Sequence, residues 1–124
     1  MNNKGVHWDR RETKVAEAAL TGARFVKLGT ADGAVVPCGA GEQAYGVAPY
    51  DVAIDKVGLV VNSGTVEVDC AGVITINTPV KSDADGKAVA ASSTNKVAGI
   101  ALDTGAASVK IRVKLLTDSI SVMA

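Results

Sequence analysis

An internal duplication constrains the fold of this 124-residue chain more than any other feature of its sequence. Residues 26–48, VKLGTADGAVVPCGAGEQAYGVA, align with residues 80–101, VKSDADGKAVAASSTNKVAGIA, when one residue is deleted. The dipeptide Asp32-Gly33 then coincides with Asp85-Gly86, and each copy predicts a strand, an Asp-Gly hairpin, a strand, a polar loop and a strand. Because one copy is too short to fold alone, we expect both copies to share one small barrel or sandwich.

Alternating apolar and polar residues predict two further half-buried strands, at residues 65–70 and 109–115. Their apolar side chains are expected to point into the core: Val66, Val68, Val109, Ile111 and Val113. Shorter strands are predicted at residues 24–28, 34–36, 45–48, 57–61, 73–76, 87–90 and 97–102, with turns at Asp32-Gly33, Ser63-Gly64 and Asp85-Gly86. The 13 glycines and an aromatic content of only 3% agree with short strands joined by turns, so we predict an all-β fold.

Residues 9–20 do not follow this pattern. Asp9 and Glu12 resemble a helix capping box, the segment VAEAAL has high helix propensity, and Gly22 is a suitable stop. These residues alone predict one short helix, whereas the family resemblance described below favours a strand. Both structures remain open for this segment.

The charges of the chain are balanced, with 13 basic and 13 acidic side chains. A net charge of zero supplies no overall field that would attract phosphate backbones or anionic lipid. No stretch approaches the about 20 consecutive apolar residues of a membrane helix, and the start MNNKGVHWDRRETK has no apolar signal-peptide core. We therefore expect a soluble protein, made in a cytoplasm, that binds neither nucleic acid nor a membrane.

Patterns for catalysis and cofactor binding are incomplete. Gly86-Lys87 lacks the upstream glycine and the hydroxyl of a P-loop, and residues 39–44, GAGEQA, lack the following helix that a dinucleotide motif needs. His7, the sole histidine, cannot form a histidine metal cluster or relay. Lys87 lies beside a turn, like the modified lysine of biotinyl and lipoyl carriers, but without their flanking signatures. We expect no enzyme activity, no metal and no cofactor.

The two cysteines, Cys38 and Cys70, match neither a CxxC redox pair nor a four-ligand zinc site. We expect free thiols. Cys70 continues the inward alternation of Val66 and Val68 and should be buried, whereas Cys38 follows Pro37 into a glycine loop and should react faster with a thiol reagent.

Three runs of the sequence together resemble the small phage capsid cement proteins, a family formerly filed as a domain of unknown function. The runs are ARFVKLGTADGAVVPCGAGEQAYGVA, GTVEVDCAGVITINTPVKSDADGKAVAAS and VAGIALDTGAASVKIRVKLL, between about Leu20 and Leu116. Their shared marks are two Asp-Gly hairpins, a GVA strand, a GTVEV strand and a closing strand of alternating valines. Some relatives are labelled RecA-like recombinases, and the missing P-loop argues against that label here.

The resemblance implies a β-barrel or tulip-like domain that assembles, often as a homotrimer, on the outer surface of an expanded phage capsid. There it would bridge neighbouring capsomers, with the major capsid protein and further copies of itself as partners. It would be made in the cytoplasm of the bacterial host and reside in the virion. Two alternatives remain: another structural virion β-domain, from a tail or baseplate, and a generic β ligand-binding module.

The resemblance begins after residues 1–11, which we predict to be an extended N-terminal arm, separate from a single β domain at residues 12–124. The arm begins with the polar run MNNKG and carries the only tryptophan. Tryptophan and arginine are frequent binding anchors, so the hypothesis for the capsid contact is His7, Trp8, Arg10 and Arg11. The alternative is that Trp8 folds back onto the barrel as a cap.

Two charged ladders accompany the alternating strands. Glu67 and Asp69 form an acidic ladder, and Lys110, Arg112 and Lys114 form a basic one. We hypothesise that they meet either across strands or across a subunit interface; otherwise they are solvated faces, because an exposed ion pair contributes only about 0 to 1 kcal/mol.

Overall fold

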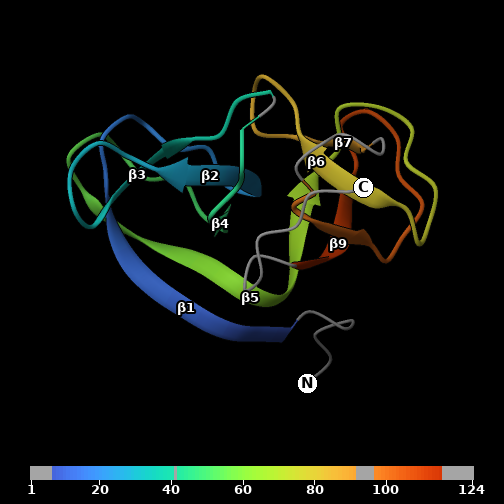
Figure 1. The fold of residues 1–124 in the computed structure, drawn as a ribbon, viewed down its shortest axis with the longest axis horizontal. Coiled ribbons are helices and arrows are strands. Elements are labelled where there is room, and N and C mark those ends of the chain that lie inside the picture. The colour runs from blue at the N-terminus through green and yellow to red at the C-terminus, as the bar shows by residue number, and fades with distance from the viewer. Residues whose placement is uncertain (1–6, 41, 92–96, 116–124) are drawn as a thin grey trace.

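The computed structural model describes residues 7–40, 42–91 and 97–115, and these residues contain strands and no helix. The strands are β1 (His7–Ala16), β2 (Arg24–Leu28), β3 (Ala34–Pro37), β4 (Gly46–Ala48), β5 (Val57–Asp69), β6 (Pro79–Ser82), β7 (Ala88–Ala90), β8 (Gly99–Ala101) and β9 (Lys110–Leu115). They form one sheet in the order β1-β3-β2-β4-β5-β9-β8-β6-β7 (Figure 1). The predicted all-β small barrel is confirmed, and no described helix is long and apolar enough to span a membrane.

The sheet is folded into two lobes that share β5 (Figure 1). Lobe A consists of β1 to β4 and the first half of β5, and it is a closed five-stranded barrel because β1 pairs with both β3 and β5. Lobe B consists of the second half of β5 and β6 to β9. An isolated bridge between Cys70, at the end of β5, and Ala88 of β7 joins its two outer strands.

The two lobes are structural repeats, and the repeat is longer than the aligned sequences. Leu20 and Val52 exchange two backbone hydrogen bonds in lobe A, as Ile74 and Gly105 do in lobe B. The left-handed non-glycine residues recur in the same places, Ala23 with Asn77 and Asp55 with Ser108. The equivalence therefore runs over residues 12–62 and 66–115, and β5 is both the last strand of one repeat and the first strand of the next.

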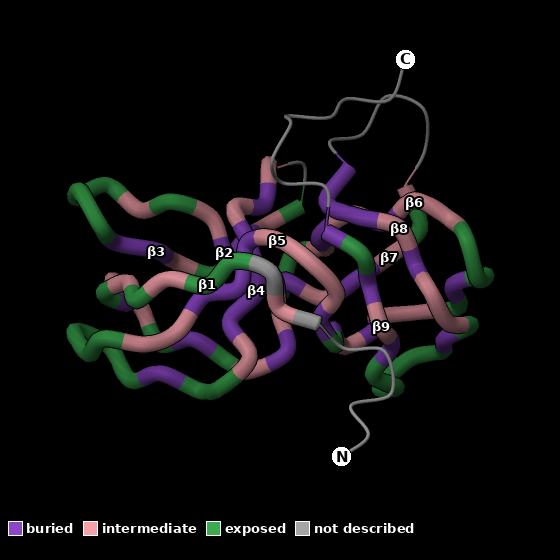
Figure 2. Tube along the Cα trace, turned by 90° about the horizontal axis from the view of Figure 1, so that it is seen from below, coloured by how far each residue is buried: buried purple, intermediate pink, exposed green. Residues whose placement is uncertain are grey.

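The core is divided between the lobes. A smaller cluster fills lobe A and includes Val26, Val35 and Val60. A larger cluster fills lobe B and also takes in Phe25 and Val47 of lobe A, whose side chains face the neighbouring lobe. Figure 2 shows buried stretches inside both lobes and exposed stretches in the loops at their ends.

The helix predicted from residues 9–20 is wrong. Residues 7–16 form strand β1, which pairs antiparallel with β5 from His7 opposite Thr65 to Val15 opposite Val57. Helix propensity is a weak local preference, and the unpaired edge of β5 offers this segment a ladder of backbone hydrogen bonds.

The boundary predicted between arm and barrel falls inside β1. Residues 7–11 belong to the sheet, since the same strand continues to Ala16 without a break, and residues 1–6 lie outside the described residues. The polar run MNNKG, which suggested a separate arm, belongs to those residues, so an arm before His7 stays a prediction.

The predicted inward alternation is confirmed for Val66, Val68, Ile111 and Val113, each at most 1% exposed. Val109 is the exception, at 46% exposed. It precedes β9 in a turn, where its N–H donates to the carbonyl of Ala106, so strand alternation does not extend to it.

Three other predictions are wrong. Residues 73–76 form no strand, because only Ile74 pairs, in an isolated bridge with Gly105. Ser63-Gly64 is not a hairpin turn, because β5 continues through it and Gly64, at φ 101°, bends the strand from one lobe into the other. Cys38 is as fully buried as Cys70, since the loop after Pro37 packs against lobe B. Both thiols are free, and burial raises the pKa of each, which keeps them in the unreactive protonated form.

Candidate interaction site

Trp8 lies on β1 opposite Gly64, at the bend of β5, where the two lobes meet. Its half-buried ring packs against the larger core cluster and meets the ring of Tyr50 edge to face, with centroids 6.2 Å apart. The indole Nε1 is buried and has no hydrogen-bond partner in the part of the chain that the structure describes. Tyr50 is 62% exposed. The alternative prediction for Trp8, a cap on the barrel, describes this position.

A cleft of about 220 Å³ opens beside Trp8 between the lobes, lined by Trp8, Ala23, Pro49, Tyr50, Val66, Glu67 and Lys110. Its wall is aromatic and apolar, while Glu67 and Lys110 place opposite charges at its edge. This chemistry suits an apolar side chain of a protein partner, with polar contacts at the rim. Sequence reasoning found Trp8 but missed Tyr50, although a chain with 3% aromatics makes each aromatic residue outside the predicted core informative.

Arg10 and Arg11 follow Trp8 and both are exposed. A regular strand would turn one of them inward, but the register of β1 against β5 shifts between Trp8 and Arg10 and again between Arg10 and Arg11. Such a β-bulge re-aims side chains. The bulge therefore leaves both arginine side chains exposed on the strand that carries Trp8. Of His7 the structure gives the strand position, opposite Thr65.

The two charged ladders meet across β5 and β9. Glu67 lies opposite Arg112 and Asp69 opposite Lys110, and the Lys110 Nζ is 3.2 Å from the Asp69 carboxylate. Lys114 lies opposite Thr65. The cross-strand arrangement is thus the one that the structure contains; a role of these residues between subunits stays a prediction.

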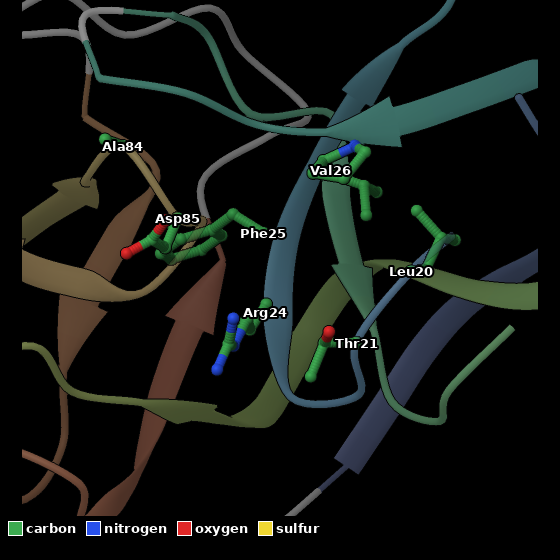
Figure 3. Close-up of a pocket in the computed structure, with 8 residues that line it drawn as sticks. Leu20, Thr21, Arg24, Phe25, Val26, Ala84 and Asp85 are labelled. Atoms are coloured by element: carbon green, nitrogen blue, oxygen red, sulfur yellow. The ribbon is translucent and has the colours of Figure 1, made fainter. Parts of the chain in front are cut away.

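A second hollow of about 210 Å³ lies at the junction on another side, between β2 and the β6–β7 turn. Figure 3 shows Phe25 directed toward Ala84 and Asp85 of lobe B, while Val26 and Leu20 lie on the lobe A side. The Phe25 N–H donates to the Gly86 carbonyl at 2.7 Å, which ties the turn to β2. This hollow is the seam between the repeats.

Lobe A also contains a polar cluster. The Tyr45 hydroxyl donates to the Glu12 carboxylate, the Asn62 amide donates to the Tyr45 oxygen at 3.2 Å, and Lys14 lies 3.3 Å from Glu12. The hydrogen bond from Tyr45 lowers the pKa of Glu12, and burial raises the pKa of Tyr45. This cluster holds β1, β4 and β5 together.

The described residues contain no group of three or more His, Cys, Asp or Glu side chains that could hold a metal ion. The Glu17 carboxylate is occupied by the backbone N–H groups of Thr30 and Ala31, which lower its pKa. The surface at the junction carries contact chemistry: the Trp8 and Tyr50 rings and an apolar cleft, on a strand that continues with the exposed Arg10 and Arg11.

Two comparisons with known proteins found matches. The family described as phage cement protein matches residues 6–115. Among solved structures, the head fiber gp8.5 N base of bacteriophage phi29 is similar with a TM-score of 0.72 and 16% identity, over 87% of this chain and 94% of that one. No curated sequence matches the chain. Since the family match covers most of the chain, this protein belongs to the phage cement protein family.

Proposed function

We propose that this chain is a structural protein of the phage head that binds the outer surface of the expanded capsid and bridges neighbouring capsomers. Family membership supports the association with a capsid, and the head fiber fold agrees with it. Its partners would be the major capsid protein and other copies of itself, as a homotrimer. The role is mechanical: contact area added across a seam raises the number of interactions that genome pressure must break.

The observation that carries the proposed contact is the Trp8 cleft with its exposed neighbours. Tyr50 lines an apolar hollow at the junction, and Arg10 and Arg11 follow Trp8 along β1 with exposed side chains. Aromatic residues and arginine dominate the energetics of protein interfaces because they gain much contact per immobilised side chain. Binding through these residues requires no chemical reaction, so the proposed role is non-enzymatic.

The test is to mix the purified protein with emptied, expanded heads of the source phage and to measure bound copies per head by electron microscopy and sedimentation. The wild type should add density on the outer surface. Tyr50→Ala should raise the protein concentration needed for half-maximal decoration about 30-fold or more, because loss of an interface anchor costs about 2 kcal/mol or more. Val73→Ala, which removes apolar atoms from a 79% exposed residue far from the cleft, is the control and should bind normally.

Three results would contradict the proposal. Wild-type protein that leaves heads bare, or that decorates tails instead, would exclude the capsid as its site. Tyr50→Ala protein that binds at full occupancy would exclude the cleft as the contact. Melting temperatures of all variants establish that each remains folded.

A further inference from the structure

The residues that form the contact between the lobes have identified equivalents in the other copy of the repeat. On the lobe B side, the Asp69 N–H donates to the Ala23 carbonyl at 2.8 Å, the Ser82 hydroxyl donates to the Cys38 carbonyl at 3.3 Å, and Lys110 lines the cleft. Asp69 and Lys110 are cross-strand neighbours. Asp69 and Ser82 mark the face of lobe B that lobe A covers, and Lys110, whose side chain is 56% exposed, lies at the edge of that face.

The same three positions in lobe A have nothing over them in the described chain. The equivalents of Asp69, Ser82 and Lys110 are Val15, Leu28 and Val57, which are 40%, 56% and 65% exposed. Val15 and Val57 are cross-strand neighbours, as their counterparts are. Lobe A therefore presents, uncovered and apolar, the face that is covered in lobe B.

The other side of the internal contact also recurs. In lobe A it is formed by Arg24, whose Nε is 3.6 Å from the Asp69 carboxylate, by Phe25 and by Pro49. Their equivalents in lobe B are Thr78, Pro79 and Leu102, all half-buried, next to Ile76, which is 54% exposed. This outer face of lobe B is apolar as well, so each end of the molecule carries one half of a contact that already exists inside it.

We propose that the outer face of lobe A (Val15, Leu28, Val57) docks on the outer face of lobe B (Ile76, Thr78, Pro79, Leu102) of a second copy, head to tail. A second copy is the expected partner, because each chain carries both of the matching faces. The inference deepens the self-association in the proposed function and rests on it. Successive contacts of this kind close into a ring when the rotation between copies divides a full turn.

The backbone indicates that side chains carry this contact. Inside the chain, the Asp69 and Phe25 N–H groups cross the junction. At the outer faces, the Val15 N–H is already bound to the Gly33 carbonyl at 2.9 Å, and Pro79 has no N–H. No backbone donor of these positions is left unsatisfied, and apolar burial is what two copies would gain.

The test transfers the internal ion pair to the new interface. Because Val15 and Thr78 are the equivalents of Asp69 and Arg24, Val15→Asp alone should bury a lone carboxylate and reduce the wild-type oligomer to single chains in light scattering. Adding Thr78→Arg in the same chain should restore the oligomer mass. Val109→Asp is the control: Val109 is 46% exposed, its lobe A equivalent is the charged Lys56, and its oligomer should match the wild type.

Three results would contradict the proposed interface. A wild-type chain that is monomeric, a Val15→Asp oligomer of unchanged mass, or a double variant that stays monomeric would overturn the interface. Binding to heads separates this interface from the proposed function. If the oligomer is lost in Val15→Asp and restored by Thr78→Arg but the protein leaves heads bare, the interface is supported and the capsid role is refuted. If heads are decorated but the Val15→Asp oligomer is unchanged, the capsid role is supported and the interface is refuted. Equal melting temperatures exclude unfolding as the cause.

Discussion

The two lobes share one backbone plan but fill it differently. Positions that hold Val66, Val68, Ala98 and Leu115 in lobe B hold Glu12, Lys14, Tyr45 and Asn62 in lobe A. Lobe B therefore has an apolar core, against which Phe25 of lobe A also packs. In lobe A, one side of the interior is instead a hydrogen-bonded polar cluster. The two copies of the repeat therefore share hydrogen-bonded turns and glycines, but not the polarity of their interiors.

The largest effect is expected when a polar residue of lobe A is placed at the equivalent position of lobe B. Val66→Glu copies Glu12 without its partners, because the positions of Lys14, Tyr45 and Asn62 hold Val68, Ala98 and Leu115 in lobe B. It loses about 1.5 to 3 kcal/mol of valine burial and adds an unpaired carboxylate, so we expect the domain to unfold at neutral pH. Urea denaturation followed by circular dichroism measures this. Val73→Glu, at an exposed site, is the control.

Retention of a cooperative transition near the wild-type midpoint in Val66→Glu would show that lobe B tolerates polar filling as lobe A does.

A second test of the difference between the lobes uses their equivalent hairpin glycines, Gly33 and Gly86, which have φ values of 74° and 81°. Nothing lies within 4 Å of a Cβ added at Gly33, whereas one added at Gly86 would lie 2.9 Å from the Phe25 carbonyl oxygen. Gly33→Ala should cost about 1 kcal/mol from backbone strain alone. Gly86→Ala should cost about 1 to 3 kcal/mol more, because the junction must shift.

Thermal denaturation of the two glycine variants measures the difference. Equal losses would mean that the β6–β7 turn does not bear on lobe A in solution.

The third comparison concerns pH and the Glu12 cluster. The hydrogen bond from Tyr45 lowers the pKa of Glu12 below its ordinary value of 4.5, so the folded state binds fewer protons there than the unfolded state. The stabilisation is present above that ordinary value and is lost as pH falls through the lower folded pKa. Glu12→Gln should therefore be less stable than the wild type by about 1 kcal/mol at pH 7.

The stability gap between Glu12→Gln and the wild type should shrink as the pH is lowered below 4.5. A gap that is constant from pH 7 to pH 3 would show that the carboxylate charge does not contribute. Lobe B has no counterpart, so Val66→Ala should show a loss that is independent of pH.

The fold was largely predictable because its strands carry alternation and its turns carry glycines. The duplication placed β2 to β4 and β6 to β8 correctly. The failures lie where tertiary pairing overrides local preference: β1 has helix propensity but an available partner in β5, and Gly64 bends a strand instead of ending it. Of the candidate site, Trp8 was found from its rarity, but Tyr50 depends on a loop position that no local pattern specifies.

The smallest expected effect concerns a contact that only lobe B has. Asp103 accepts hydrogen bonds from the Arg112 guanidinium and backbone N–H at 2.7 to 2.9 Å, while the equivalent lobe A residues are Tyr50 and Leu59. Both partners are about one third exposed, so Asp103→Asn should cost only about 0.5 to 1 kcal/mol at low salt, less at high salt. The Arg112 hydrogen bond lowers the pKa of Asp103, so this contribution is present at neutral pH and is lost as pH falls below 3.8 through the lower folded pKa. Urea denaturation at two salt concentrations measures it. If Asp103→Asn instead lowers the free energy of unfolding by several kcal/mol, and salt does not change that loss, the ion pair contributes to the lobe B core. The difference between the two lobes would then include the loops of lobe B.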